Sequence, residues 1–188
     1  MKAKRGDYGY IKVRKRNAVL KTVLLALIGI AVFVTGLLLN KMSNKNIFTV
    51  IAVLFVLPGA KSLVAFIVLF PYRTVSEELY KKAEGRLVSG MMLYADLVIT
   101  SSEKVMHLDL LAVGNGQVIG LLGSKKQDIS YVRKYLRDGV HNWGTDYKVK
   151  IVEEENIFLT ELSNVIVVEE VNAEEEENVK TYLRSLIV

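Results

Sequence analysis

The chain has no cysteine and only two prolines among its 188 residues. The absence of cysteine excludes disulfides, thiol catalysis and thiolate metal sites. Charge is missing from two stretches: residues 22–39 contain no Asp, Glu, Lys or Arg, and residues 47–70 contain Lys61 as their single charge. Two uncharged apolar runs separated by a short polar segment are typical of a pair of membrane-spanning helices.

The length of these runs matches a bilayer. A helix of eighteen residues is roughly 27 Å long at about 1.5 Å per residue, close to the roughly 30 Å of hydrocarbon in a membrane. A helix also satisfies every backbone amide within the segment, as lipid requires. We predict a basic leader over residues 1–17, a transmembrane helical hairpin over 18–73 with helices at about 18–39 and 47–70, and a soluble domain over 74–188.

Positive charge is concentrated at the N-terminal end. Residues 1–73 contain twelve Lys or Arg and one Asp, whereas residues 74–188 contain thirteen Lys or Arg and nineteen Asp or Glu. Seven of the basic residues lie in the leader, and two lie in the polar turn between the apolar runs. By the positive-inside rule the leader is cytoplasmic, and two spans return the chain to the same side. We therefore expect a two-pass protein of the inner (plasma) membrane with both termini in the cytoplasm.

Lys61 is an unusual residue for a membrane span, and it closely follows Pro58 and Gly59. Proline removes a backbone hydrogen bond and favours a kink, and glycine allows close approach of a neighbouring helix. A lysine costs about 3 kcal/mol at the helix centre on insertion scales, so it is a candidate functional residue. Its long side chain can reach the cytoplasmic headgroups, or it can pair with an acidic residue of another subunit. Pro58, Gly59 and Lys61 are the candidate membrane or partner contacts.

Residues 74–188 alternate between helical and strand patterns. Leu79 and Ala83 recur at helical spacing after Ser76, a plausible cap, and Asn115-Gly116 is a strong signal for a tight hairpin turn. The predicted elements are a helix at 75–87, strands at 91–100, 105–113 and 117–122, a helix at 128–140, a strand at 147–152, a helix at 156–162, a strand at 164–168 and a helix at 173–186. The order α-β-β-β-α-β-α-β-α predicts an α+β fold. We expect this domain, cut at Thr74, to fold alone.

Asp109 lies in the second of these strands, and Leu122-Gly123-Ser124 closes the third. With the order α-β-β-β-α-β over about residues 75–152, this arrangement resembles the restriction-endonuclease-like fold, including its nuclease-related domains. The resemblance implies a divalent-metal site with an acid on the second strand, where Asp109 stands, and a Glu-x-Lys on the third. Here Lys125 and Lys126 follow too late and the glutamate is missing. The alternative for Asp109 is a surface-facing acid at an edge of the sheet. We expect a degenerate nuclease-like fold that binds no metal or cofactor.

Charge patterning points to a protein partner. The helix at 128–140 has a basic outer face, and Trp143, the single tryptophan, follows it as either a packing residue or a binding anchor. The candidate interaction residues are Lys125, Lys126, Arg133, Lys134, Arg137 and Trp143. The net negative charge of the domain argues against nucleic acid as a partner.

These features favour a non-catalytic interaction or regulatory module held at a membrane. Its expected partners are the lipid bilayer and either another protein or a second copy of the chain. The sequence leaves two alternatives open. One is a membrane-tethered, metal-dependent, nuclease-like enzyme that uses Asp109, and the other is a small accessory subunit of a membrane complex that uses Lys61.

Overall fold

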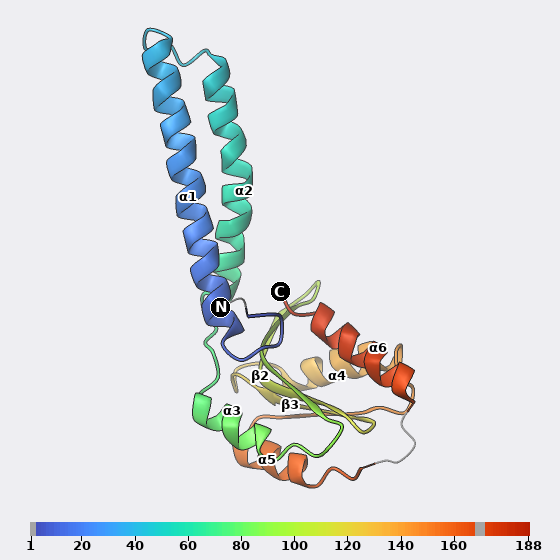
Figure 1. Cartoon of the computed structure of the whole chain (residues 1–188). Coiled ribbons are helices and arrows are strands. Elements are labelled where there is room, and N and C mark those ends of the chain that lie inside the picture. The colour runs from blue at the N-terminus through green and yellow to red at the C-terminus, as the bar shows by residue number, and fades with distance from the viewer. Residues whose placement is uncertain (1–2, 168–171) are drawn as a thin grey trace. The chain divides into compact units, whose positions relative to one another are not determined.

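The computed structural model describes residues 3–167 and 172–188 (Figure 1). The chain divides into two compact units. One is Lys12–Pro71, and the other is Tyr72–Val188 together with the leader up to Ile11. Leader residues therefore belong to the same folded body as the domain that follows the hairpin, a grouping that the composition of the leader does not indicate.

The Lys12–Pro71 unit is a helical hairpin of α1 (Tyr10–Leu39) and α2 (Ile47–Leu69), which lie side by side (Figure 1). Both helices are long and apolar enough to cross a membrane. A Cβ atom at Gly36 would clash with the side chain of Phe48, so glycine is required at this contact between the two helices. Asn46 caps α2 by accepting a hydrogen bond from the Thr49 N–H at 3.0 Å.

The helix boundaries differ from the prediction at one end. α1 begins at Tyr10 rather than at residue 18, so the second half of the predicted leader is helical. Residues 10–17 contain neither glycine nor proline, and Gly9, with φ of +81°, separates the helix from the preceding turn. α2 continues through Pro58 as one helix and ends at Leu69.

The second unit is an α+β domain, which confirms the predicted fold class. Its sheet has the order β1-β2-β3-β4, with the first three strands antiparallel and β4 parallel to β3. The strands are β1 (Met92–Thr100), β2 (Val105–Gly114), β3 (Gln117–Leu122) and β4 (Lys148–Val152), and the helices are α3 (Glu77–Glu84), α4 (Ile129–His141), α5 (Glu155–Ser163) and α6 (Ala173–Ser185). α4 and α6 pack on one face of the sheet, and α3 and α5 pack on the other (Figure 1).

The local signals for turns and caps are confirmed. Ser76 accepts a hydrogen bond from the Leu79 N–H at the start of α3. Asn115 and Gly116 both have positive φ angles, 51° and 68°, in the turn between β2 and β3. Gly114, with φ of 148°, packs so closely on the backbone of Gly90 that a side chain there would not fit.

The predicted strand at 164–168 is not a strand over residues 164–167, the part of it that the structure describes. Residues 164–167 form a turn and an extended segment without a partner strand, and Val168 lies outside the described residues. The run of β-branched residues predicted a strand, because such residues favour extended backbone. However, Ile166 and Val167 are 76% and 52% exposed, which shows that this part of the run is not built into the sheet.

The outer edge of β1 is covered by both ends of the chain. The Ala95 N–H donates to the Gly6 carbonyl at 2.8 Å, and Ile99 pairs with Ile187. The hydroxyl of Tyr10 donates to the Val188 carbonyl at 2.9 Å. An exposed strand edge is a template for unwanted pairing, so these segments protect the domain as well as completing its core.

Candidate functional site

Asp96 is the most unusual residue of the domain. It lies in the middle of β1 with φ of +58°, and its side chain is completely buried. A non-glycine residue in this region of backbone space costs on the order of 1–3 kcal/mol and persists only where the surroundings hold it. The neighbouring residues Ala95 and Leu97 pair with Leu110 and Leu108, so Asp96 stands opposite Asp109.

The carboxylate of Asp96 holds two separate segments of the chain. Its Oδ2 accepts a hydrogen bond from the Ile11 N–H at 3.2 Å, and its Oδ1 accepts one from the Val75 N–H at 3.1 Å. Ile11 is in the first turn of α1, where backbone amides have no acceptor within the helix. Burial raises the pKa of Asp96, whereas the amides of Val75 and Ile11 lower it. One buried side chain thus fastens the segment that precedes the hairpin and the segment that follows it.

Asp109 lies at a β-bulge in β2. Leu108 pairs with Leu122 and Leu110 pairs with Leu121, so Asp109 is an extra residue relative to β3. Its side chain is 26% exposed. Burial, followed by the negative charges of Asp96 and Glu155, raises the pKa of Asp109 to about 6. The two acids therefore interact across two strands that are both irregular at the same level of the sheet.

His107 completes a row of polar groups with these two acids. Its Nε2 lies 3.8 Å from Oδ1 of Asp109, and its ring packs on that of Tyr72 with centroids 4.8 Å apart. The Gln127 side chain fixes the backbone of His107 by accepting from its N–H at 2.7 Å and donating to its carbonyl at 2.8 Å. We refer to Asp96, Asp109 and His107 as the acid–histidine row.

Gly123 makes room for this row. A Cβ atom at Gly123 would clash with the imidazole of His107 and lie 2.8 Å from Oδ1 of Asp109. Gly123 is the middle residue of Leu122-Gly123-Ser124, the segment where the resemblance would place Glu-x-Lys, and the position that the resemblance gives to the acid is Leu122. Within residues 3–167 and 172–188, no group of three or more His, Asp or Glu side chains could hold a metal ion. The chemistry that the row supports directly is proton uptake by Asp109 near pH 6.

Asp96 is the functional candidate that sequence reasoning missed. The available signal was a single acid inside a strand of otherwise mostly apolar residues, facing the equally isolated Asp109 across a predicted antiparallel pair. The backbone amides that it binds were not visible in the sequence, because they belong to segments 21 and 85 residues away.

The basic candidates on and before α4 are not all available to a partner. Arg133 donates to the Ile151 carbonyl at 3.1 Å, so it links α4 to β4. The Nζ of Lys125 lies 3.9 Å from Oε1 of Glu154. Lys126 lines a pocket of about 390 Å³ with Lys104 and other residues between β2 and the start of α4. Lys134 and Arg137 are exposed on the outer face of α4, although Arg137 lies 3.5 Å from Asp138.

Trp143 lies next to other aromatic residues. It is 48% exposed and stacks on Tyr182 of α6 with ring centroids 6.0 Å apart. Burial raises the pKa of Tyr182, and the adjacent Tyr135 raises it further. Tyr135 in turn stacks on Tyr131, with centroids 6.4 Å apart. We call these four residues the aromatic strip; Tyr131 and Tyr135 lie on α4, Trp143 lies in the loop after it, and Tyr182 lies on α6.

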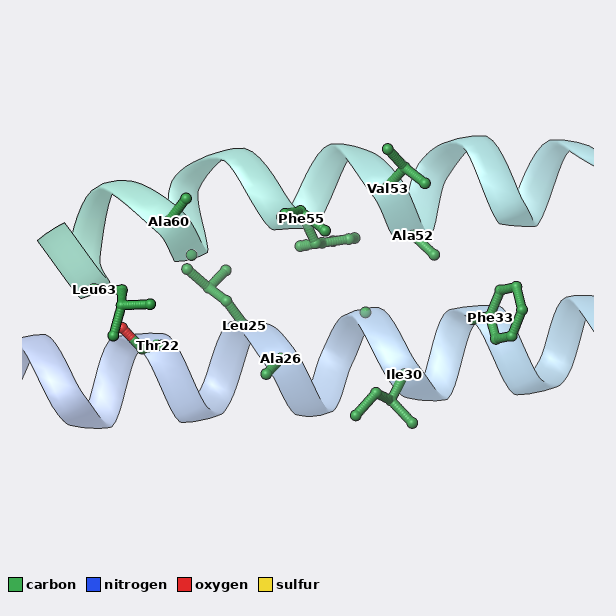
Figure 2. A pocket seen from close by; sticks show the side chains of 13 residues that line it. Thr22, Leu25, Ala26, Ile30, Phe33, Ala52, Val53, Phe55, Ala60 and Leu63 are labelled. Carbon is green, nitrogen blue, oxygen red and sulfur yellow. The ribbon is translucent and has the colours of Figure 1, made fainter.

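The hairpin contains an apolar pocket of about 570 Å³ between its helices (Figure 2). Leu25 and Phe33 of α1 and Phe55 and Leu63 of α2 are among the residues that line it, and Thr22 supplies a hydroxyl. Of the candidates in α2, Gly59 lines this pocket, whereas Lys61 is exposed. The lining of the pocket is almost entirely apolar.

Comparisons with protein-family models, curated proteins and solved structures find no match to this chain. Its function is therefore inferred from its own residues.

Proposed function

We propose that this chain is a two-pass membrane protein whose cytoplasmic domain is a non-catalytic interaction module. The observation that carries the proposal is the aromatic strip with the half-exposed Trp143 at one end. Tryptophan, tyrosine and arginine are the residues that contribute most to binding at protein interfaces, and they do so best when they are already rigid. The stacking on Tyr182 restrains the indole of Trp143 before any partner arrives.

The organisation of the units supports the topology. The leader up to Ile11 and Tyr72–Val188 form one compact unit. Both ends of the hairpin are therefore joined to the same folded body, and both must lie on the same side of a membrane. This argument does not depend on charge. The seven basic residues of the leader then favour the cytoplasmic side.

We expect a cysteine placed at Ser43, in the turn of the hairpin, to react with a membrane-impermeant maleimide in intact cells. The natural chain has no cysteine, so each introduced thiol is the single reactive group. The matched control is Asp146→Cys, an exposed position of the domain, which should react only after permeabilisation. The opposite pattern would reverse the orientation, and equal labelling of both sites in intact cells would contradict the two-pass topology.

The surface around the strip suggests what kind of partner it binds. Lys134 and Arg137 are exposed on the same helix that carries Tyr131 and Tyr135. A partner that offers an apolar pocket for Trp143 and acidic side chains for these cations would complement both features. A second copy of the chain also has acidic side chains, at Glu174 to Glu177.

A photo-crosslinking residue at Lys134 should yield a defined crosslinked species from the full chain in its membrane. We expect Trp143→Ala to reduce its yield about tenfold or more, because a central aromatic anchor contributes about 2 kcal/mol or more. The control places the same residue at Lys81, on the helix at the opposite face of the sheet. Co-expression of two differently tagged chains identifies a homo-oligomer. Equal yields from both positions, or no effect of Trp143→Ala, would contradict the proposed surface.

An enzymatic alternative rests on Asp109, which is partly solvent-exposed and whose pKa is raised to about 6 by burial and by the charges of Asp96 and Glu155. A membrane-tethered, metal-dependent nuclease would show stabilisation by Mg²⁺ or Mn²⁺ and cleavage of nucleic acid. Both properties would be abolished in Asp109→Asn. The third possibility, an accessory subunit, predicts that Lys61→Leu loses a co-purifying protein.

A further inference from the structure

Asp96 connects the folded domain to both segments that lead to the hairpin. Its carboxylate binds the amide of Ile11, one residue before the Lys12–Pro71 unit begins, and the amide of Val75, four residues after that unit ends. Tyr72, directly after the hairpin, packs on His107. The acid–histidine row therefore underlies the segment that leaves the hairpin, as well as fixing the end of the leader.

The backbone around Asp96 is held in an unfavourable state. Asp96 has φ of +58° inside a strand, and Asp109 lies at a bulge directly opposite. The positive φ of Asp96 costs free energy relative to a regular strand, so the surrounding contacts hold it in place. Strained backbone of this kind clusters at active sites, ligand clamps and switch regions.

The groups that face Asp109 come from several elements. Asp96 faces it from β1, His107 lies beside it on β2, and Glu155 acts on it from the first turn of α5. Gly123, after β3, contributes no charge. Of these groups, the two other carboxylates oppose ionisation of Asp109, and a protonated His107 would favour it.

We propose that Asp96 and Asp109 form a proton-operated latch, which holds the segments on either side of the membrane hairpin to the sheet while Asp109 is protonated and loosens when Asp109 ionises. In the closed state the hydrogen bonds from the amides of Ile11 and Val75 favour the ionised form of Asp96 against its burial. Asp109 is the neutral member, since its burial and the negative charges of Asp96 and Glu155 favour the protonated form of its carboxyl. Ionisation of Asp109 places a second negative charge opposite Asp96 inside the sheet. The repulsion is relieved by moving Asp96 and thereby releasing the amides of Ile11 and Val75.

The direction in which pH acts on the latch follows from the raised pKa of Asp109. Because the pKa of Asp109 is raised from its ordinary value to about 6, the folded domain binds a proton that the unfolded chain releases at lower pH. The closed latch is therefore favoured below about pH 6. It weakens as the pH rises through about 6, the pKa of Asp109.

Hydrogen exchange of the full chain in lipid nanodiscs, measured by mass spectrometry and corrected for intrinsic rates, tests this latch. Between pH 5 and pH 7.5, we expect protection of peptides that contain Ile11 and Val75 to fall about tenfold, the equivalent of one pKa unit. Asp109→Asn mimics the neutral acid, so it should keep at pH 7.5 the protection that the natural chain has at pH 5. A peptide from α4 should show no change.

Two matched variants separate the latch from other effects. Asp146→Asn makes the same chemical change at an exposed site and should behave like the natural chain. His107→Gln tests the other titratable member of the row and should leave the midpoint near pH 6. Protection that does not change with pH, an Asp109→Asn variant that follows the natural chain, or a transition that disappears with His107→Gln would each overturn the proposal.

Discussion

Deleting the leader should destabilise the domain that follows the membrane hairpin. We compare residues 72–188 alone with a chimera in which the leader up to Ile11 is joined to Tyr72 through a flexible Gly/Ser linker. Tyr10 and Ile11 are 6% and 1% exposed, and burial of a large apolar side chain contributes about 1.5–3 kcal/mol. The shorter fragment also loses two hydrogen bonds, the one from the Ala95 N–H to the Gly6 carbonyl and the one from the Ile11 N–H to the Asp96 carboxylate. We expect it to be less stable by about 4 kcal/mol.

Urea unfolding followed by circular dichroism and by the fluorescence of Trp143, the single tryptophan, measures both fragments. A chimera with Tyr10→Ala and Ile11→Ala retains the linker and the leader but removes the buried side chains, so it should resemble the shorter fragment. If residues 72–188 alone are as stable in urea as the intact chimera, the leader is dispensable for folding. The prediction from the sequence that a domain cut at Thr74 folds alone would then hold.

Asp96→Ala should be the most damaging single substitution in the acid–histidine row. It removes the acceptor of two buried backbone amides, and an unsatisfied buried donor costs about 1–3 kcal/mol. Alanine also tolerates the positive φ of this position poorly. We expect a loss of about 3 kcal/mol in the free energy of unfolding, measured in the chimera at pH 5, where the latch is closed.

Asp96→Asn is the informative comparison for that substitution. Asparagine keeps one oxygen acceptor, tolerates positive φ and removes a charge opposite Asp109, so it should cost about half as much as alanine or less. Asp146→Ala, at an exposed position, should leave the stability within about 0.5 kcal/mol of the natural chain. Equal losses for Asn and Ala at Asp96 would show that its contribution is charge rather than hydrogen bonding.

The parts of the fold that sequence predicts well are those determined locally. The uncharged runs define two helices because lipid and helix geometry together fix a length. The turn at Asn115-Gly116 and the cap at Ser76 depend only on neighbouring residues, and the apolar spacing of Val132, Leu136 and Val140 locates the buried face of α4.

The parts that sequence misses depend on contacts between distant residues. Nothing local indicates that the leader packs on β1, or that Asp96 binds amides on both sides of the hairpin. The same limit applies to Trp143, whose exposure is set by Tyr182, and to residues 164–167, where strand propensity finds no neighbouring strand. The sequence identifies Asp109 as an isolated acid, but it does not show that Asp109 lies at a bulge near Asp96, His107 and Glu155.

The contact between Tyr10 and Val188 has a consequence for the timing of synthesis. These residues are 178 positions apart, and Ile11 is 85 positions before Asp96. At roughly 5–20 residues per second, the leader waits several seconds at the ribosome before any of β1 exists. During that interval the hairpin emerges and can enter the bilayer. Docking of the leader is therefore a late event in assembly, and its buried side chains, Tyr10 and Ile11, are exposed to chaperones and proteases until then.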